Sequence, residues 1–168
     1  MSEFIPWNSQ PLDEWADRYA EGDFVDLGGR RTHFVERGQG KPVLLIHGFN
    51  LDLQTWIKNL YRLAAHFKVY APDLWGQGYG TRQPLDYGYD LFEEQIRLFM
   101  EALDIPRASL VGHSMGGGTS IVFSLRNRHK VDKLVLSDAT GIPTRQPFRA
   151  KVFRLKGVAE FLMSRNSD

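Results

Sequence analysis

The residue best suited to covalent chemistry in this chain is Ser114, which lies in the sequence Gly112-His113-Ser114-Met115-Gly116. The apolar run 108–111 comes directly before it. Gly-x-Ser-x-Gly between a strand and a helix is typical of a nucleophile elbow, a sharp turn that presents the serine hydroxyl at the bend. Glycines are needed there because the strand and the helix pack too closely for side chains. The pattern therefore predicts a nucleophilic serine.

A nucleophilic serine also needs hydrogen-bond donors for the oxyanion that forms when it attacks a carbonyl group. The backbone N–H of Met115, the residue after the serine, is one donor by position. Residues 47–50, His-Gly-Phe-Asn, follow the apolar run 43–46 and supply a second loop. We expect the N–H of Phe49 to be the second donor. The residues expected to line the substrate-binding site beside these donors are His47, Gly48, Asn50 and His113.

These motifs lie in an alternation of short strands and helices. The apolar run 42–47 is typical of a strand that is buried on both faces, and helical spacing of apolar residues covers 53–66 and 91–103. Strands that alternate with helices predict an α/β fold, a mostly parallel sheet with helices on both faces. The expected strands are 23–27, 31–36, 42–47, 67–71, 108–112 and 131–137. The expected helices are 11–20, 53–66, 91–103, the segment from the elbow to about 127, and a segment from 148.

Composition excludes several classes of function. The 168 residues are 42% hydrophobic and 24% charged, with a net charge of +1. This balance is typical of one globular domain and is too weakly basic for a dedicated nucleic-acid binder. The absence of cysteine excludes disulfides and thiolate chemistry. No secretory signal or membrane-spanning run is present, so we expect a cytoplasmic protein with no membrane partner, and no metal or dinucleotide motif implies a cofactor.

The motifs between residues 42 and 136 resemble those of the α/β-hydrolase superfamily, in particular its small esterase-like members. The matching segments are 42–49, 71–78, 111–117 and 131–136. The resemblance implies an α/β-hydrolase fold in which Ser114 is the nucleophile and the N–H groups of Phe49 and Met115 form the oxyanion hole. Relatives that resemble haloalkane dehalogenases or epoxide hydrolases carry aspartate at the elbow, so the serine disfavours those activities.

The same resemblance divides the chain into three parts. Residues 1–22 form an N-terminal arm with a helix, and 23–140 form the N-terminal part of the hydrolase core. Residues 141–168 are the start of a cap, so the fold is expected to be truncated after the sixth strand and the start of this cap.

The order of catalytic residues in this family is nucleophile, acid and then histidine, and the last two have no clear match here. Each of the five histidines has a structural interpretation: a strand position, the oxyanion turn, two helix ends and the elbow itself. They are His33, His47, His66, His129 and His113. Asp138, which ends the strand 131–137, is the candidate acid. The alternative is that Asp138 fixes the start of the cap, as Asp73 is expected to brace its own loop.

The strand 131–137 lies inside the sheet in the family, so a sheet that ended there would expose an apolar edge. We therefore expect the chain to be the N-terminal half of a hydrolase of about twice this length. The base and the acid would then come from a second chain or from a missing C-terminal segment.

The function predicted from these residues is hydrolysis of a small carboxylic ester through an acyl-serine intermediate. Phe49, Trp75 and Phe148 suggest an apolar pocket for the acyl or alcohol group, although packing in the core or cap is an alternative for each. Hydrolysis of a carbon–carbon bond and perhydrolysis are alternatives on the same scaffold. A further alternative is a truncated binding module without catalysis.

Overall fold

The computed structural model describes residues 11–142 of the chain. The strands are β1 (Asp23–Asp26), β2 (Arg31–Arg37), β3 (Pro42–Ile46), β4 (Lys68–Pro72), β5 (Ala108–His113) and β6 (Val131–Ser137). The α-helices are α1 (Leu12–Tyr19), α2 (Ile57–Leu63), α3 (Tyr89–Ala102) and α4 (Met115–Arg126). Two short 3₁₀ segments, η1 (Leu53–Trp56) and η2 (Arg128–Lys130), lie before α2 and β6.

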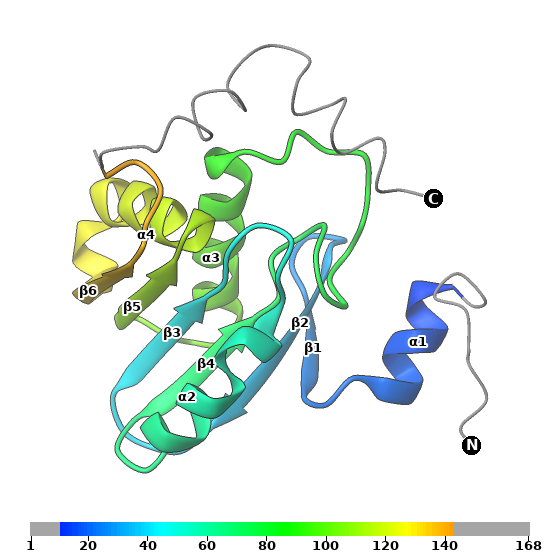
Figure 1. Ribbon diagram of the computed structural model, residues 1–168, viewed down its shortest axis with the longest axis horizontal. Coiled ribbons are helices and arrows are strands. Elements are labelled where there is room, and N and C mark those ends of the chain that lie inside the picture. Colours follow the sequence, from blue (N-terminus) through cyan, green and yellow to red (C-terminus); the bar gives the residue numbers. More distant parts are fainter. Residues whose placement is uncertain (1–10, 143–168) are drawn as a thin grey trace.

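The six strands form one sheet in the order β1-β2-β4-β3-β5-β6 (Figure 1). β3 pairs in parallel with β4 and β5, and β5 pairs in parallel with β6. β2 is antiparallel to both of its neighbours. The sheet is thus mostly parallel, as the sequence predicts.

Helices cover both faces of this sheet because the central strands are apolar on both sides. Leu44 and Ile46 of β3 pack on one face with apolar residues of α3 and α4. Val43 and Leu45 pack on the other face with η1 and α2. Figure 1 shows α2 and α3 on these opposite faces. Alternate residues of a strand point to opposite faces, so one apolar run supplies two cores.

The expected helix over 53–66 is divided into η1 and α2. The Asp52 carboxylate accepts a hydrogen bond from the Gln54 N–H at 2.9 Å, which starts a tighter turn before the α-helix begins. Residues 143–168, including the helix expected from 148, lie outside the described part. Among the helices that the structure describes, none has the length and apolar character required to cross a membrane.

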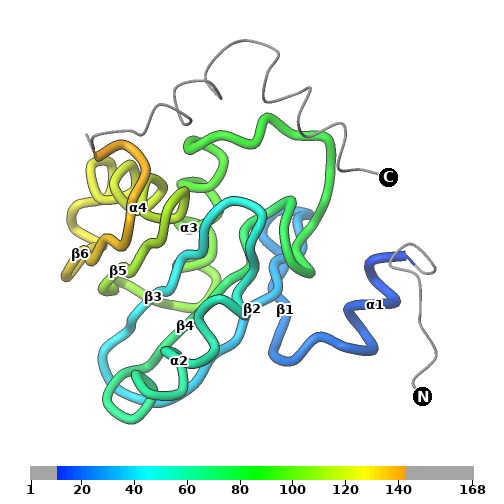
Figure 2. The backbone as a smooth tube through the Cα atoms, in the orientation of Figure 1, coloured from blue at the N-terminus to red at the C-terminus, as the bar shows by residue number. Residues whose placement is uncertain are grey.

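The sheet order places two loops side by side at the carboxyl ends of the central strands. Ile46 at the end of β3 is paired with Gly112 of β5. The residues that follow these two strands, 47–50 and 114–116, are therefore neighbours. The path of the chain past these strand ends can be followed in Figure 2. Ligand sites of parallel sheets lie at this edge.

Candidate active site

Ser114 lies at a sharp bend between β5 and α4. Its backbone angles are φ 51° and ψ −117°, a conformation that is costly for a residue with a side chain. Hydrogen bonds fix this bend, because the Ser114 N–H donates to Ser137 O at 3.0 Å. Its carbonyl accepts hydrogen bonds from the N–H groups of Gly118 at 3.1 Å and Thr140 at 3.0 Å. This is the local geometry of a nucleophile elbow.

Glycine at position 116 allows α4 to begin directly against β3. A Cβ atom there would lie 2.3 Å from the carbonyl oxygens of both Ile46 and His47. The loop after β3 also approaches the elbow closely, since a Cβ at Gly48 would lie 3.1 Å from the Ser114 Cβ. The structure therefore brings together the two segments that the sequence predicted to share one site.

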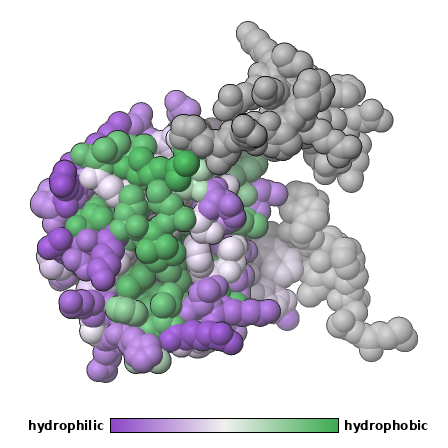
Figure 3. Space-filling view, turned by 60° about the vertical axis from the view of Figure 1, so that its left-hand side comes forward, coloured by the Kyte–Doolittle hydropathy of each residue, from purple (hydrophilic) through white to green (hydrophobic). Residues whose placement is uncertain are grey.

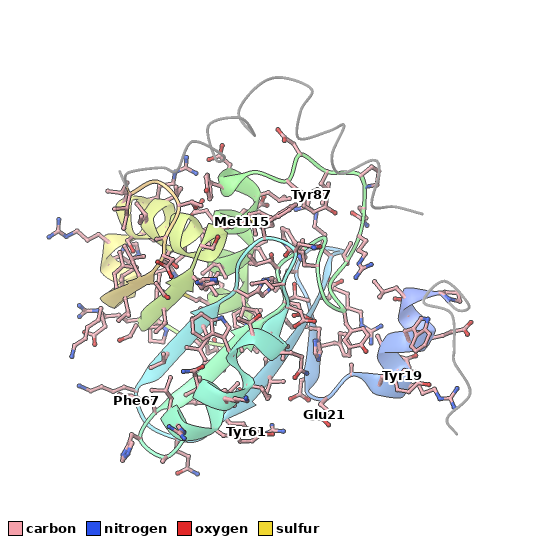
Figure 4. The ribbon with its side chains drawn as sticks, in the orientation of Figure 1. Tyr19, Glu21, Tyr61, Phe67, Tyr87 and Met115 are labelled. Carbon is pink, nitrogen blue, oxygen red and sulfur yellow. The ribbon has the colours of Figure 1, made fainter. Side chains whose placement is uncertain are left out.

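The N–H groups of Met115 and Phe49 are the candidate oxyanion donors. Neither donates a hydrogen bond within residues 11–142, so both are free to donate to an oxyanion. Met115 begins α4 next to the serine, and Figure 4 shows it at this end of the helix. Phe49 lies at the rim, with 62% of its surface exposed.

His47 fixes the orientation of the peptide that carries the Phe49 N–H. Its Nε2 accepts a hydrogen bond from the Leu74 N–H at 2.9 Å, so its Nδ1 carries the hydrogen and donates to Gly48 O at 2.9 Å. In a trans peptide the C=O and the N–H point in opposite directions. Because the Gly48 carbonyl points to His47, the Phe49 N–H points away from it.

The expectation that His47 lines the substrate-binding site needs correction. The residue has no exposed surface, and both ring nitrogens are used within the protein. Burial also lowers the pKa of His47 from its ordinary value of 6.5. His47 is therefore a neutral residue that positions the loop and does not itself contact a substrate.

Of the other residues expected around the serine, Gly48 is buried, whereas His113 and Asn50 reach the surface. His113 is partly buried, and its Nδ1 lies 3.2 Å from Ser137 O. Asn50 is exposed, with φ 55°. It lines a hollow of about 790 Å³ together with residues of α1 and of the loop after β4. Gln77 is part of this wall, and its side-chain oxygen accepts a hydrogen bond from the Leu51 N–H at 3.2 Å.

Asp138, the candidate acid, follows β6 directly and is exposed, with φ 45°. Within residues 11–142 its carboxylate makes no hydrogen bond or ion pair. The structure therefore places Asp138 at the correct end of the sheet without joining it to the serine.

None of the histidines hydrogen-bonds to the Ser114 hydroxyl within the described residues. His33 is buried with Asp73 and His47 is buried beneath the loop, whereas His66, after α2, and His129, within η2, are exposed. His113 is the neighbour of Ser114 in the chain, and its Nδ1 faces Ser137. All five histidines of the chain lie within the described residues, so this part of the chain shows no histidine paired with the serine.

Two supporting residues of the elbow were missed in the sequence. The Thr140 hydroxyl donates to Ser114 O at 3.1 Å and lies 2.7 Å from the Tyr89 hydroxyl. These residues are 26 and 51 positions from their partners, so no local pattern could have indicated them. The bracing role expected for Asp73 is confirmed, because its carboxylate accepts hydrogen bonds from the Leu53 and Tyr79 N–H groups.

The aromatic pocket suggested by the sequence is reduced to Phe49. Trp75 has no exposed surface and belongs to the core, which confirms the packing alternative for this residue, and Phe148 lies outside the described residues. Other apolar side chains at this end are exposed: Leu51, Tyr87, Tyr89 and Ile142. Figure 4 shows Tyr87 on the loop that leads to α3. The described part of the chain contains no group of acidic residues and histidines that could hold a metal ion.

Comparison with known proteins identifies the arrangement. The family described as alpha/beta hydrolase fold matches residues 41–166. A curated relative, the 2-hydroxy-6-oxo-2,4-heptadienoate hydrolase of Pseudomonas putida, is 35% identical over 126 residues, which cover 72% of this chain and 45% of the relative.

Solved structures give the same result. The meta-cleavage product hydrolase of Pseudomonas fluorescens IP01 is 33% identical with a TM-score of 0.70, over 74% of this chain and 47% of that one. An epoxide hydrolase of Bacillus megaterium is 27% identical with a TM-score of 0.67, over 70% of this chain and 42% of that one. The chain spans less than half the length of the curated relatives that it matches.

Proposed function

The chain belongs to the α/β-hydrolase family, and on this premise we propose that it supplies the nucleophile and the oxyanion hole of a serine hydrolase. The observation that carries the proposal is the bend at Ser114, which is held at the carboxyl edge of the sheet against the loop of Gly48. The epoxide hydrolase among its structural neighbours shares the fold, but the serine at the bend favours attack on a carbonyl carbon.

The proposed reaction proceeds through an acyl-serine intermediate. The Ser114 oxygen attacks a substrate carbonyl carbon while a general base removes the hydroxyl proton. The oxyanion that forms receives hydrogen bonds from the N–H groups of Phe49 and Met115. Collapse of this intermediate expels the leaving group, which takes up a proton, and water then hydrolyses the acyl-serine.

Of the two candidate reactions, we favour hydrolysis of a carbon–carbon bond next to a carbonyl group. The Pseudomonas relative and the solved meta-cleavage product hydrolase support this choice. The exposed apolar side chains around the elbow fit an extended apolar substrate. Hydrolysis of a small carboxylic ester is the second candidate, because the same serine and oxyanion donors would serve it.

We further propose that the base and the acid come from a segment that packs beside β6. Four consecutive residues of β6, Asp132–Val135, are exposed, and Leu125 of α4 is 79% exposed beside them. A hollow of about 330 Å³ lies between α4 and β6. Figure 3 shows a hydrophobic band on this side of the molecule. An unpaired sheet edge favours pairing with another strand, and Leu134, Val135 and Leu125 are the exposed apolar residues of this one. The exposed residues of β6 together with Leu125 are called the β6 edge surface below.

A covalent serine-directed probe tests the nucleophile. We expect a fluorophosphonate to label Ser114 when the chain is prepared with any segment that accompanies it, and Ser114→Ala to abolish the label. Ser124→Ala on the same helix is the matched control and should be labelled normally. Absence of labelling would favour a binding module without catalysis.

Substrate class is tested with the same preparations. We expect turnover of 2-hydroxy-6-oxo-2,4-heptadienoate that depends on Ser114, with weaker turnover of short nitrophenyl esters. Faster ester turnover would reverse the order of the two candidates. An active monomer of this chain alone, established by gel filtration and mass spectrometry, would contradict the proposal that another segment supplies the base.

A further inference from the structure

A buried histidine outside the candidate active site, His33 of β2, is placed between two hydrogen-bond acceptors. Its Nδ1 lies 2.7 Å from the Asp73 carboxylate, and its Nε2 lies 3.0 Å from the carbonyl oxygen of Glu21. Glu21 lies on the connection from α1 to β1, as Figure 4 shows. The side chains of His33 and Asp73 are 2% and 1% exposed, so water does not replace either contact.

These contacts determine the number of hydrogens on the pair. A backbone carbonyl only accepts hydrogen bonds, so the His33 Nε2 carries a hydrogen. A second hydrogen must lie between the His33 Nδ1 and the Asp73 carboxylate. Without it, the lone pair of the nitrogen would face a lone pair of the carboxylate oxygen in the protein interior, which is unfavourable. The pair is therefore either an imidazolium with a carboxylate or a neutral imidazole with a protonated Asp73.

The surroundings of Asp73 favour the ionised form. Its carboxylate also accepts hydrogen bonds from the Leu53 N–H at 2.8 Å and from the Tyr79 N–H at 3.0 Å. Donors that converge on a carboxylate stabilise its charged state. Among the contacts that the structure describes for His33, Asp73 is the charged partner, and the rings of Phe24 and Tyr79 pack beside it.

Through Asp73 this histidine reaches the loop after β3 and the loop after β4. Leu53 begins η1, directly after the loop that carries Phe49. Leu74, next to Asp73, donates to His47, which orients the Phe49 peptide. The main chain adds a further link, because the Asp73 N–H donates to His33 O at 2.8 Å. A side chain at Gly78 would overlap the carboxylate, so the loop is closed tightly around it.

We propose that His33 is a buried imidazolium cation that holds Asp73 as a carboxylate, and that it thereby acts as a positioning residue for the loop after β3, which carries Phe49, and for the loop after β4. The charge of His33 does not depend on the proposed function, whereas its role in positioning rests on it. Ser114→Ala would remove the nucleophile and leave the charge of His33 unchanged.

Nuclear magnetic resonance of the ¹⁵N-labelled chain at neutral pH tests the charge directly. We expect hydrogens attached to both ring nitrogens of His33, with the same signals in Ser114→Ala. The exposed His66 serves as an internal reference for a histidine without buried partners. A His33 ring with a hydrogen on Nε2 alone would place the proton on Asp73 and overturn the proposal.

A pair of substitutions tests the positioning. His33→Gln leaves the Asp73 carboxylate buried without its cation, so we expect lower resistance to denaturant and faster amide exchange at Leu53 and Tyr79. Adding Asp73→Asn removes the unpaired charge, and we expect the double variant to recover part of the lost resistance. His66→Gln should match the unaltered chain. Strictly additive losses, or unchanged exchange at the two loop amides, would show that His33 only fills space.

Discussion

At the scale of single residues, the carbonyl of Ser114 is unusual because two N–H groups and the Thr140 hydroxyl donate to it. These hydrogen bonds hold the residue in a conformation that it would otherwise leave. The loop of Gly48 is fixed by one neutral histidine in the same way. The peptides that carry the proposed oxyanion donors are therefore held by the protein's own hydrogen bonds, as stabilisation of an oxyanion would require.

The buried His47 predicts a pH dependence of stability. Its folded pKa lies below the ordinary value of 6.5, so between these two values the unfolded chain binds more protons than the folded one. Its contribution is complete above about pH 6.5. The contribution of His47 to the free energy of unfolding falls by up to about 1.4 kcal/mol per pH unit as the pH drops from about 6.5 to the lowered pKa of the folded state. Unfolding in denaturant at several pH values measures this slope.

Comparison of variants tests whether the pH dependence of the free energy of unfolding comes from His47. His47→Gln should be less stable at pH 8 and should lack this part of the slope, whereas the exposed His66→Gln should keep it. An unchanged slope in His47→Gln would contradict the assignment.

The close contact at Gly116 predicts that adding a single methyl group there strongly lowers the stability of the folded chain. Gly116→Ala would place a Cβ 2.3 Å from two carbonyl oxygens of the β3 end, so β3 and α4 would have to separate. We expect a loss of about 3 kcal/mol in the free energy of unfolding. Gly88→Ala, where nothing lies within 4 Å, should cost less than about 1 kcal/mol. Similar losses for both variants would exclude the steric explanation.

At the scale of elements, the site depends on how the end of β6 is joined to α3 and to the elbow. Thr140 links these elements through its hydrogen bonds to Ser114 and Tyr89. The strands were predicted within about two residues, because an apolar run of strand length is a local signal. The links of Thr140 and of His33 join residues 26 to 51 positions apart. Only the folded sheet brings such residues together, so the sequence could not indicate them.

The link between Thr140 and Tyr89 can be measured by a double-mutant cycle. Thr140→Val should lower the free energy of unfolding by about 1 kcal/mol. Tyr89→Phe should cost a similar amount, and the two losses should not add, because both remove the same hydrogen bond. Tyr61→Phe on the exposed side of α2 is the control. Full additivity would show that the two hydroxyls do not act together.

At the scale of the whole molecule, the β6 edge surface adjoins the carboxyl ends of the strands at Asp138, which directly follows β6. The proposed nucleophile and oxyanion donors lie on one side of this point, and the exposed strand lies on the other. A segment that paired with β6 would thus deliver its own loops close to Ser114. The fold and the bend at Ser114 followed from the sequence, whereas the nucleophilic role of Ser114 stays a prediction. No base or acid could be assigned, because none of the five histidines hydrogen-bonds to the Ser114 hydroxyl within the described residues.

The β6 edge surface predicts how the chain associates. A lysine on an exposed strand edge opposes pairing, so Val135→Lys should reduce self-association and should weaken binding of any segment that packs beside β6. The residue is 51% exposed, and its replacement should leave the free energy of unfolding within about 0.5 kcal/mol. Light scattering measures the association. Tyr61→Lys, on another exposed apolar residue, should have no effect, and equal effects would point to net charge alone.

The helix α1 forms one wall of the hollow beside Asn50 and is attached to β2 through ion pairs, so the shape of this hollow should depend on ionic strength. Arg31 reaches Asp13 and Asp17 of α1 at 3.7 and 3.3 Å, and these carboxylates are 83% and 72% exposed. Such pairs are weak, and the distance over which charges attract falls from about 10 Å at 0.1 M salt to about 3 Å at 1 M. The wall of the hollow that α1 forms would therefore loosen in concentrated salt while the sheet beneath it stays closed, and the width of this hollow would vary with the salt around the protein.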